Sequence, residues 1–347
     1  MNWKVEQIPE LTGYTVEWAE PGRYYLSRQN RIYQSENLTP PFKEIGRVDA
    51  PFWKEIAGNF RLGQRLLRFM VYNVVPLKNG DVFVTFDKTV GVIKDGKYRP
   101  LDGLVRPCRV LRFGCAVDPD GNVFFGEYLA NKEKGEMRIY KYPSGGDRLE
   151  IAYTFPAGAI THVHGLYFDS FSNAIYCLTG DAEIECQILK SNDGFATIET
   201  VGSGDETWRA VSLLFDENYI YYGTDAEFRS NHIMRINRKT LERETLGEVN
   251  GTVFYSKKIS NDLFFTTTAE NAPSQKENVA MLWHIGPDGK CSNLATFEKD
   301  RWHPGLFMFG TIHFPYINAL DDRLYFSLIG LKGDNKTFCA RRIGKTA

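Results

Sequence analysis

The sequence has almost no net charge, no long apolar run and no closely paired cysteines. Its 42 Lys and Arg residues nearly balance its 43 Asp and Glu residues, so a general attraction to nucleic acid or to an anionic membrane is not expected. No stretch approaches the roughly 20 apolar residues that span a bilayer. We therefore expect no nucleic-acid partner and no membrane association.

Signals for export and for disulfide bonding are missing as well. The N-terminal segment MNWKVEQIPELTGY lacks the basic stretch and apolar run of a secretory signal peptide. The 6 cysteines form no C-x-x-C pair, and most fall in or beside apolar strand-like runs, where a buried free thiol is expected. These absences favour a cytoplasmic location.

Common enzyme motifs do not occur either. We find no Walker A loop, dinucleotide fingerprint, nucleophile elbow or zinc knuckle. Long helical periodicity is also absent, and only the segment 51–68 has the pattern of a helix or an irregular insertion. An all-β chain is therefore expected.

A pattern of short apolar strands recurs about every fifty residues. One strand begins with Arg or His, a second follows a polar turn, and an acidic residue closes it. The clearest copies are LRFGCAVDPDGNVFFGE (111–127), HVHGLYFDSFSNAIYCLTGD (162–181) and WRAVSLLFDENYIYYGTD (208–225). A repeat of this length built from short strands is typical of a β-propeller, whose blades surround one central channel.

The repeats predict seven blades of four antiparallel strands in a single domain, residues 1–347. Six first strands begin near Arg68, Arg112, His162, Arg209, Val253 and Phe307. The segment before them has enough strand-like sequence for most of another blade. Gly, Asn and Asp in the intervening turns supply the positive φ angles of tight hairpins. Six blades with an N-terminal extension are the main alternative.

Four-stranded blades bring the start of every first strand and the end of every second strand to the same face of the molecule. These positions are polar in several blades of this sequence, so we expect them to line one central site. The first-strand starts bring Arg68, Arg112, His162, His164, Arg209 and Tyr255. The second-strand ends bring Asp87, Glu127, Asp181, Asp225 and Glu270.

The segment His162-Val163-His164-Gly165 is the most distinctive motif. Alternation along a strand places both imidazoles on one face, roughly 6.5–7 Å apart along the backbone. Together with Asp181 they could ligate a divalent transition metal, or one imidazole could act as a base while the other binds substrate. Two histidines hydrogen-bonded into a polar channel wall are the alternative. His313, on an apolar run, is expected in the core.

Arginines and one tryptophan indicate the chemistry of the ligand. Guanidinium groups match carboxylates or phosphates in two-point fashion. Trp302, in a loop before the last first strand, could stack on a sugar ring. The predicted substrate-binding residues are Arg68, Arg112, Glu127, Arg209, Asp225, Glu270, Arg301 and Trp302.

The segment KSNDGFATIETV (190–201) resembles the Asp-box hairpin, S-x-D-x-G-x-x-W, of sialidase-like propellers. Ser191 and Asp193 match, whereas Phe195 stands where that family has Gly and Ile198 where it has Trp. The box is a structural hairpin in that family, so the resemblance implies a propeller fold. The arginine clamp and the Tyr–Glu pair of the family would fall on Arg112, Arg209, Tyr255 and Glu270. The family's F/Y-R-I-P motif is absent.

The chain also resembles propeller lyases that act on uronic-acid polysaccharides with His, Arg and Tyr. β-Elimination needs a group that neutralises the carboxylate, a base near the α-proton and an acid for the leaving oxygen. The resemblance gives these roles to Arg112 or Arg209, to His162 or His164, and to Tyr255.

The sequence thus predicts a glycan-acting enzyme, a hydrolase or lyase, that binds an acidic carbohydrate in the central funnel. Paired carboxylates such as Glu127 with Asp181 or Asp225 would favour glycoside hydrolysis. The predicted catalytic residues are His162, His164, Tyr255 and Asp181, and a divalent metal on His162, His164 and Asp181 is an open option. The alternative is a non-catalytic carbohydrate- or protein-binding propeller.

Overall fold

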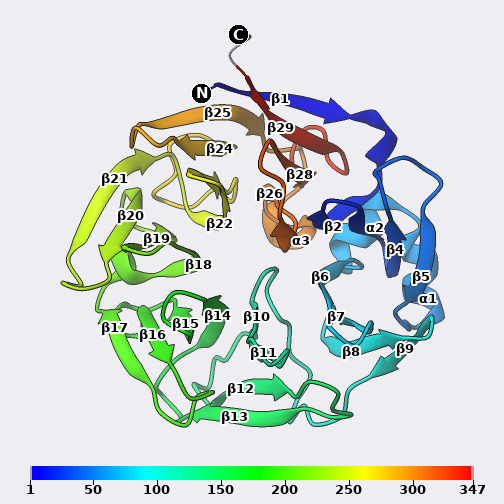
Figure 1. The fold of residues 1–347 in the computed structure, drawn as a ribbon, viewed down its shortest axis with the longest axis horizontal. Helices are drawn as coiled ribbons and strands as arrows, with labels where there is room; N and C mark the ends of the chain where they lie inside the picture. Colours follow the sequence, from blue (N-terminus) through cyan, green and yellow to red (C-terminus); the bar gives the residue numbers. More distant parts are fainter. Residues whose placement is uncertain (1, 345–347) are drawn as a thin grey trace.

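A computed structural model describes residues 2–344 and shows seven antiparallel blades arranged in a ring around a central channel (Figure 1). The all-β, seven-bladed prediction is confirmed, and the six-bladed alternative is wrong. No helix in residues 2–344 is both long and apolar enough to cross a membrane. All six cysteines are free thiols, as predicted.

Blades 1 to 6 take their strands in chain order, from the channel outward. Blade 1 consists of β2 (Thr15–Glu20), β3 (Arg23–Arg28), β4 (Arg31–Ser35) and β5 (Lys43–Arg47). Blade 2 consists of β6 (Val71–Pro76), β7 (Val82–Phe86), β8 (Thr89–Lys94) and β9 (Lys97–Pro100). Blade 3 consists of β10 (Cys115–Val117), β11 (Val123–Gly126), β12 (Met137–Tyr142) and β13 (Glu150–Phe155).

The next three blades follow the same order. Blade 4 consists of β14 (His162–Asp169), β15 (Ala174–Gly180), β16 (Gln187–Ser191) and β17 (Glu199–Ser203). Blade 5 consists of β18 (Ala210–Phe215), β19 (Tyr219–Thr224), β20 (Asn231–Asn237) and β21 (Arg243–Val249). Blade 6 consists of β22 (Val253–Ile259), β23 (Asp262–Thr267), β24 (Val279–Ile285) and β25 (Cys291–Glu298).

Blade 7 joins the two ends of the chain and closes the ring. Its three inner strands are β26 (Thr311–His313), β28 (Arg323–Ile329) and β29 (Thr337–Ile343), and its outer strand is β1 (Asn2–Ile8). β1 pairs antiparallel with β29 along its whole length, and β27 (Ile317–Asn318) pairs parallel with β2. The N-terminal segment therefore supplies a whole blade and the closing strand, more than the sequence predicted.

Helical structure is short and lies in the connections. α1 (Phe52–Gly58) and α2 (Arg61–Leu66) occupy the link between blades 1 and 2, where the sequence predicts a helix or an irregular insertion. α3 (Pro304–Phe307), which the sequence analysis missed, precedes blade 7. Single 3-10 turns are η1 (Pro9–Leu11), η2 (Glu183–Glu185) and η3 (Glu206–Trp208).

A β-bulge distorts the first strand in five blades and decides which side chains face the channel. In blade 4 the register passes from Val163 to Gly165, so that His164 has no partner on β15. Bulges re-aim side chains in this way. The equivalent extra residues include Glu17, Tyr72, Val211 and Phe254, and all of these but Glu17 line the central cavity, as does His164.

Glycines set the spacing between neighbouring blades near the channel. Gly126 on β11 packs against Val163 of the next blade, and Gly223 on β19 packs against Val253 in the same way. A Cβ atom at these glycines would come within 2.4 and 2.3 Å of the valines, so a larger residue would push the blades apart. These contacts hold the first strands of blades 4 and 6 at the positions that form the site.

Candidate functional site

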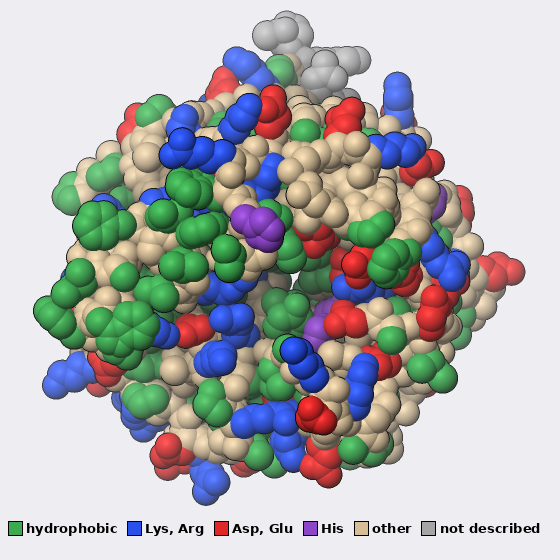
Figure 2. Space-filling model, turned by 180° about the vertical axis from the view of Figure 1, so that it is seen from behind, with side chains coloured by type: hydrophobic (Ala, Val, Ile, Leu, Met, Phe, Trp, Pro, Cys, Tyr) green, Lys and Arg blue, Asp and Glu red, His purple; other side chains and the backbone are tan. Residues whose placement is uncertain are grey.

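A cavity of about 650 Å³ opens at the centre of one face of the propeller. The loops that enter the first strands and leave the second strands form this face, as the sequence predicts. Figure 2 shows it hollowed at the centre, with basic side chains gathered on one side and acidic ones on the other. The charged and imidazole side chains of the lining are Arg68, Arg109, Arg112, Arg209, Asp181, Asp225, Glu227, Glu270, His164 and His313.

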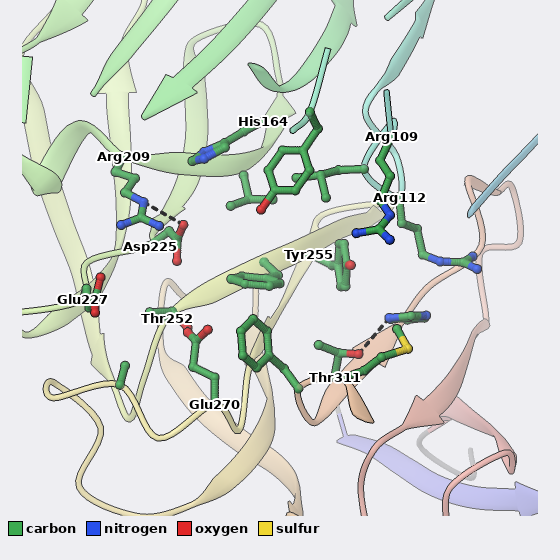
Figure 3. A pocket seen from close by; sticks show the side chains of 18 of the residues that line it. Arg109, Arg112, His164, Arg209, Asp225, Glu227, Thr252, Tyr255, Glu270 and Thr311 are labelled. Carbon is green, nitrogen blue, oxygen red and sulfur yellow. Dashed lines mark hydrogen bonds and ion pairs between the residues drawn. The ribbon is translucent and has the colours of Figure 1, made fainter. Parts of the chain in front are cut away.

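Most of the charged side chains lie on two opposite walls of the cavity, although Arg209 lies on the acidic side beside Asp225. Arg109 and Arg112 lie on one side, and Asp225, Glu227 and Glu270 lie on the other (Figure 3). A ligand that carries an anionic group at one end and hydroxyl groups at the other matches this arrangement, because guanidinium groups bind anions and carboxylates accept hydrogen bonds from hydroxyls.

His162, His164 and Asp181 form a tight cluster at the edge of this cavity. The two Nε2 atoms are 3.1 Å apart. His162 Nε2 lies 3.2 Å from Asp181 Oδ2, and His164 Nε2 lies 3.5 Å from Asp181 Oδ1. The bulge at His164 brings the two rings together although the strand register breaks between them. One ligand atom from each residue therefore points at a common space.

The protonation states of this cluster suit a divalent cation. His164 Nδ1 lies 3.0 Å from the carbonyl oxygen of Ala210, which can only accept, so Nδ1 carries the proton and Nε2 is free to ligate. Burial lowers the pKa of His164 and keeps its ring neutral. Burial raises the pKa of Asp181, but its contacts with His162 and His164 outweigh this and hold the pKa well below its usual range. A neutral imidazole and an ionised carboxylate are groups that a transition metal binds.

Arg209 connects the cluster to the acidic wall. Its Nη2 lies 3.1 Å from Asp181 Oδ1, and its Nε lies 2.9 Å from Asp225 Oδ2. Burial raises the pKa of Asp225 well above its usual range, against the opposing effect of Arg209, and the nearby charges of Glu270 and Asp181 add to the rise. One guanidinium thus pairs with two carboxylates. Because its pKa is raised, Asp225 binds a proton more readily than an exposed Asp does.

Glu270 is held in place by two threonine hydroxyls on the same wall. Thr268 Oγ1 donates to Glu270 Oε1 at 3.0 Å, and Thr252 Oγ1 also donates to Oε1. Burial raises the pKa of Glu270. Because hydroxyls orient the carboxyl without neutralising it, Glu270 can accept and release a proton at a fixed position.

Four residues that the sequence placed at the central site lie elsewhere. Asp87 is outside the cavity lining and pairs with Lys54 at 3.0 Å. Glu127 is fully buried and ion-pairs with Arg106 at 2.7 Å, and it accepts a hydrogen bond from the Tyr140 hydroxyl at 3.0 Å. Its backbone continues the pairing with the third strand, so the side chain turns away from the cavity. Arg301 and Trp302 line a separate surface pocket beside α2, and the residues that follow α3, Met308 and Phe309, line the central cavity instead.

Arg112 reaches the cavity but is already paired. It is 4% exposed, and its Nη1 lies 2.5 Å from Oε2 of Glu17. Its Nη2 also donates to the carbonyl oxygen of Val71 at 2.8 Å. Arg68, by contrast, lines the cavity without an ion-pair partner among residues 2–344. Arg109 also has a carboxylate partner, since its Nη2 lies 3.4 Å from Asp87 Oδ1. Arg68 is therefore the arginine best placed to bind an anion, and Arg109 can assist it through its remaining donors.

Arg109 and His313 line the cavity although the sequence did not predict either of them there. Arg109 lies 3 residues before Arg112, and the first strand of that blade starts only at Cys115. His313, expected in the core, is buried but lines the cavity, with Nε2 2.8 Å from Thr311 Oγ1 and Nδ1 without a hydrogen-bond partner in the described chain. The first strand of blade 7 begins at Thr311 rather than near Phe307. With that register, His313 takes the third position of its strand, as His164 does in β14.

The fold and the site define a seven-bladed β-propeller with a central cavity lined by charged side chains and a His/Asp cluster whose ligand atoms lie within 4.8 Å of one another. A solved oligogalacturonate lyase in complex with manganese is similar over 99% of this chain and 96% of its own, with 10% identity and a TM-score of 0.62. The extracellular domain of a two-component system from B. thetaiotaomicron has 11% identity and a TM-score of 0.61. The match covers 99% of this chain but only 40% of that structure. A chain of a mitotic checkpoint complex matches at 10% identity and a TM-score of 0.57, over 98% of this chain and 93% of its own.

No protein-family model matches the sequence, and no protein in the curated set is similar to it. At about 10% identity the similarities show the fold alone, because one fold hosts many unrelated functions. The segment 190–201 that resembles an Asp-box forms the turn between β16 and β17. There Asp193 accepts hydrogen bonds from the Thr197 amide and hydroxyl at 2.9 and 2.7 Å.

Proposed function

We propose that this protein binds an acidic sugar in the central cavity and cleaves its glycosidic bond by β-elimination, assisted by a divalent cation. The convergence of His162, His164 and Asp181 beside a cavity with a basic and an acidic wall carries this proposal. The manganese-bound lyase among the structural neighbours is consistent with it.

His162, His164 and Asp181 would hold the cation. A divalent cation bound there would supply positive charge for the sugar carboxylate and so acidify the adjacent carbon. Arg68 and Arg109 bind the carboxylate from the basic wall. The acidic wall accepts hydrogen bonds from the sugar hydroxyls, which orients the ring.

The elimination step requires one base and one acid. The base removes the proton from the carbon next to the carboxylate, those electrons form a carbon–carbon double bond, and the glycosidic carbon–oxygen bond breaks. Glu270 is suited to take the proton because its pKa is raised by burial. Tyr255 lines the cavity, and burial raises its pKa, so its hydroxyl stays protonated and can donate to the leaving oxygen.

The proposal is tested with the full-length protein, Mn²⁺ and oligogalacturonates. We expect products that absorb as conjugated double bonds and whose masses add up to that of the substrate, whereas hydrolysis would add a water. His164→Ala should abolish both Mn²⁺ binding, measured by calorimetry, and cleavage. His232→Ala, a half-buried histidine outside the cavity, should change neither. Mn²⁺ affinity that is equal in the His164 variant and the parent would refute the metal site.

Ligand binding without cleavage is the second candidate. Arg209 already pairs with two of the carboxylates that line the cavity, which suits a stable binding site as well as a reactive one. The same experiment separates the two functions, because a binding protein would show affinity for the acidic sugar with no product after prolonged incubation.

A further inference from the structure

A second cavity of about 570 Å³ adjoins the central one. Its walls come from the loops that follow the second strands of blades 2, 3 and 4 and from the segments that enter blades 3 and 4. Arg109, Tyr128 and Asp181 line both cavities. Each of the two histidines lines one cavity: His164 lines the central cavity, and His162 lines the second one. The His/Asp cluster therefore lies at the junction of two adjacent spaces.

The charges of the second cavity differ from those of the first. The central cavity has four carboxylates to offset its arginines. The second cavity has only the shared Asp181 against four cationic side chains, which are Lys88, Arg109, Lys132 and Lys134. It is therefore the more strongly basic of the two spaces.

Two of these cations are not engaged by the protein. Lys88 and Lys132 are exposed, and neither side chain has an ion pair or a hydrogen bond within residues 2–344. Lys134, in contrast, is bound by Glu185 and Thr161. The imidazole of His162 is a further group without a partner, because its Nδ1 is buried and has no hydrogen bond within the same described range. A ligand in this cavity would meet free donors at its rim and an unpaired ring nitrogen at its inner end.

We propose that the second cavity binds a neighbouring anionic sugar unit of the same substrate chain, so that the substrate is a polyanionic oligosaccharide of at least two acidic units. This inference rests on the proposed function and adds the substrate class to it. Lys88 and Lys132 bind the carboxylate of the second unit. The linkage between the two units then crosses the His162–His164–Asp181 cluster, which places the bond to be broken beside the proposed cation.

Binding measurements with probes of different length and charge test this inference. Calorimetry on the Mn²⁺-loaded protein compares galacturonate, its trimer, and a neutral trisaccharide. We expect the affinity of the acidic trimer to be at least about tenfold higher than that of the monomer, because one further charge-assisted contact provides a gain of that size. The neutral trisaccharide should show no such gain.

The variant Lys88→Ala/Lys132→Ala should lose the gain for the trimer and keep the monomer affinity of the parent. Lys88→Arg/Lys132→Arg should restore the gain because it keeps the charge. Lys239→Ala/Lys290→Ala removes two exposed lysines from the turns between third and fourth strands, on the opposite face, and should behave as the parent does.

Two results would overturn the inference. One is an equal affinity for monomer and trimer in a protein that cleaves oligogalacturonate. The other is a parallel loss of monomer and trimer affinity in the Lys88→Ala/Lys132→Ala variant, which would place both lysines at the central cavity. Absence of cleavage with the length-dependent gain intact would count against the proposed function and would support the second cavity as an anion site.

Discussion

The guanidinium of Arg112 and the carboxylate of Glu17 form a buried ion pair, with 2.5 Å between Nη1 and Oε2 and a separation of 95 positions in the sequence. The pair joins blade 1 to the loop that enters blade 3. Ser27 Oγ also donates to Glu17 Oε1 at 2.5 Å. These contacts fix the position of Arg112 on the cavity wall, and they assign it a structural role beside any role in ligand binding.

Arg112→Met is expected to lower the free energy of unfolding by about 3–5 kcal/mol, because Glu17 would remain buried without its partner. Adding Glu17→Gln should recover part of that loss, since the unpaired charge is then removed. Denaturant titration of both single variants and the double variant measures the coupling. Strictly additive losses would show that the two side chains do not depend on each other.

His313 is expected to make the protein less stable in mild acid. Burial lowers its pKa well below the usual 6.5. As the pH falls below about 6.5, His313 binds a proton in the unfolded chain but stays neutral in the folded protein. The free energy of unfolding therefore decreases. His313→Gln should flatten this part of the stability–pH curve. The comparison uses thermal unfolding from neutral pH downward, and identical slopes for parent and variant would rule out the contribution.

Glu270 is expected to affect the pH dependence of stability in the opposite direction from His313. Burial raises its pKa in the folded state, so the folded protein binds the extra proton at pH values just above the normal range. The free energy of unfolding should therefore decrease as the pH rises through that window. Glu270→Gln removes the dependence and should reduce turnover about 100-fold or more. A variant with full turnover on oligogalacturonate would exclude Glu270 as the base.

The closing strand β1 is expected to contribute strongly to stability through Trp3. Its ring is 8% exposed and contacts Phe264 of blade 6 edge-on, with 4.9 Å between centroids. Trp3→Ala should lower the free energy of unfolding by about 3–5 kcal/mol. Lys4→Ala, which removes only an exposed ion pair with Glu6, should cost less than about 1 kcal/mol. Equal effects of the two changes would mean that β1 closes the ring without packing on it.

The polar pattern at strand ends predicted part of the cavity lining correctly by position. Asp181, Asp225 and Glu270 follow second strands and face the cavity, because antiparallel blades bring those ends to one face. Glu127 has the same place in its repeat but pairs with Arg106. Nothing in the local pattern separates these cases, since Arg106 reaches Glu127 from another segment of the fold.

The strand and turn pattern by itself determined the blade architecture, because each blade is built from strands adjacent in the sequence and joined by tight turns. Only the tertiary structure decided which polar residues meet. The contact of His164 with Ala210 of blade 5, the Glu17 partner of Arg112 and the packing of His313 on Tyr255 of blade 6 are all contacts between blades. Such contacts join residues far apart in the chain, and their geometry is set only when the ring closes.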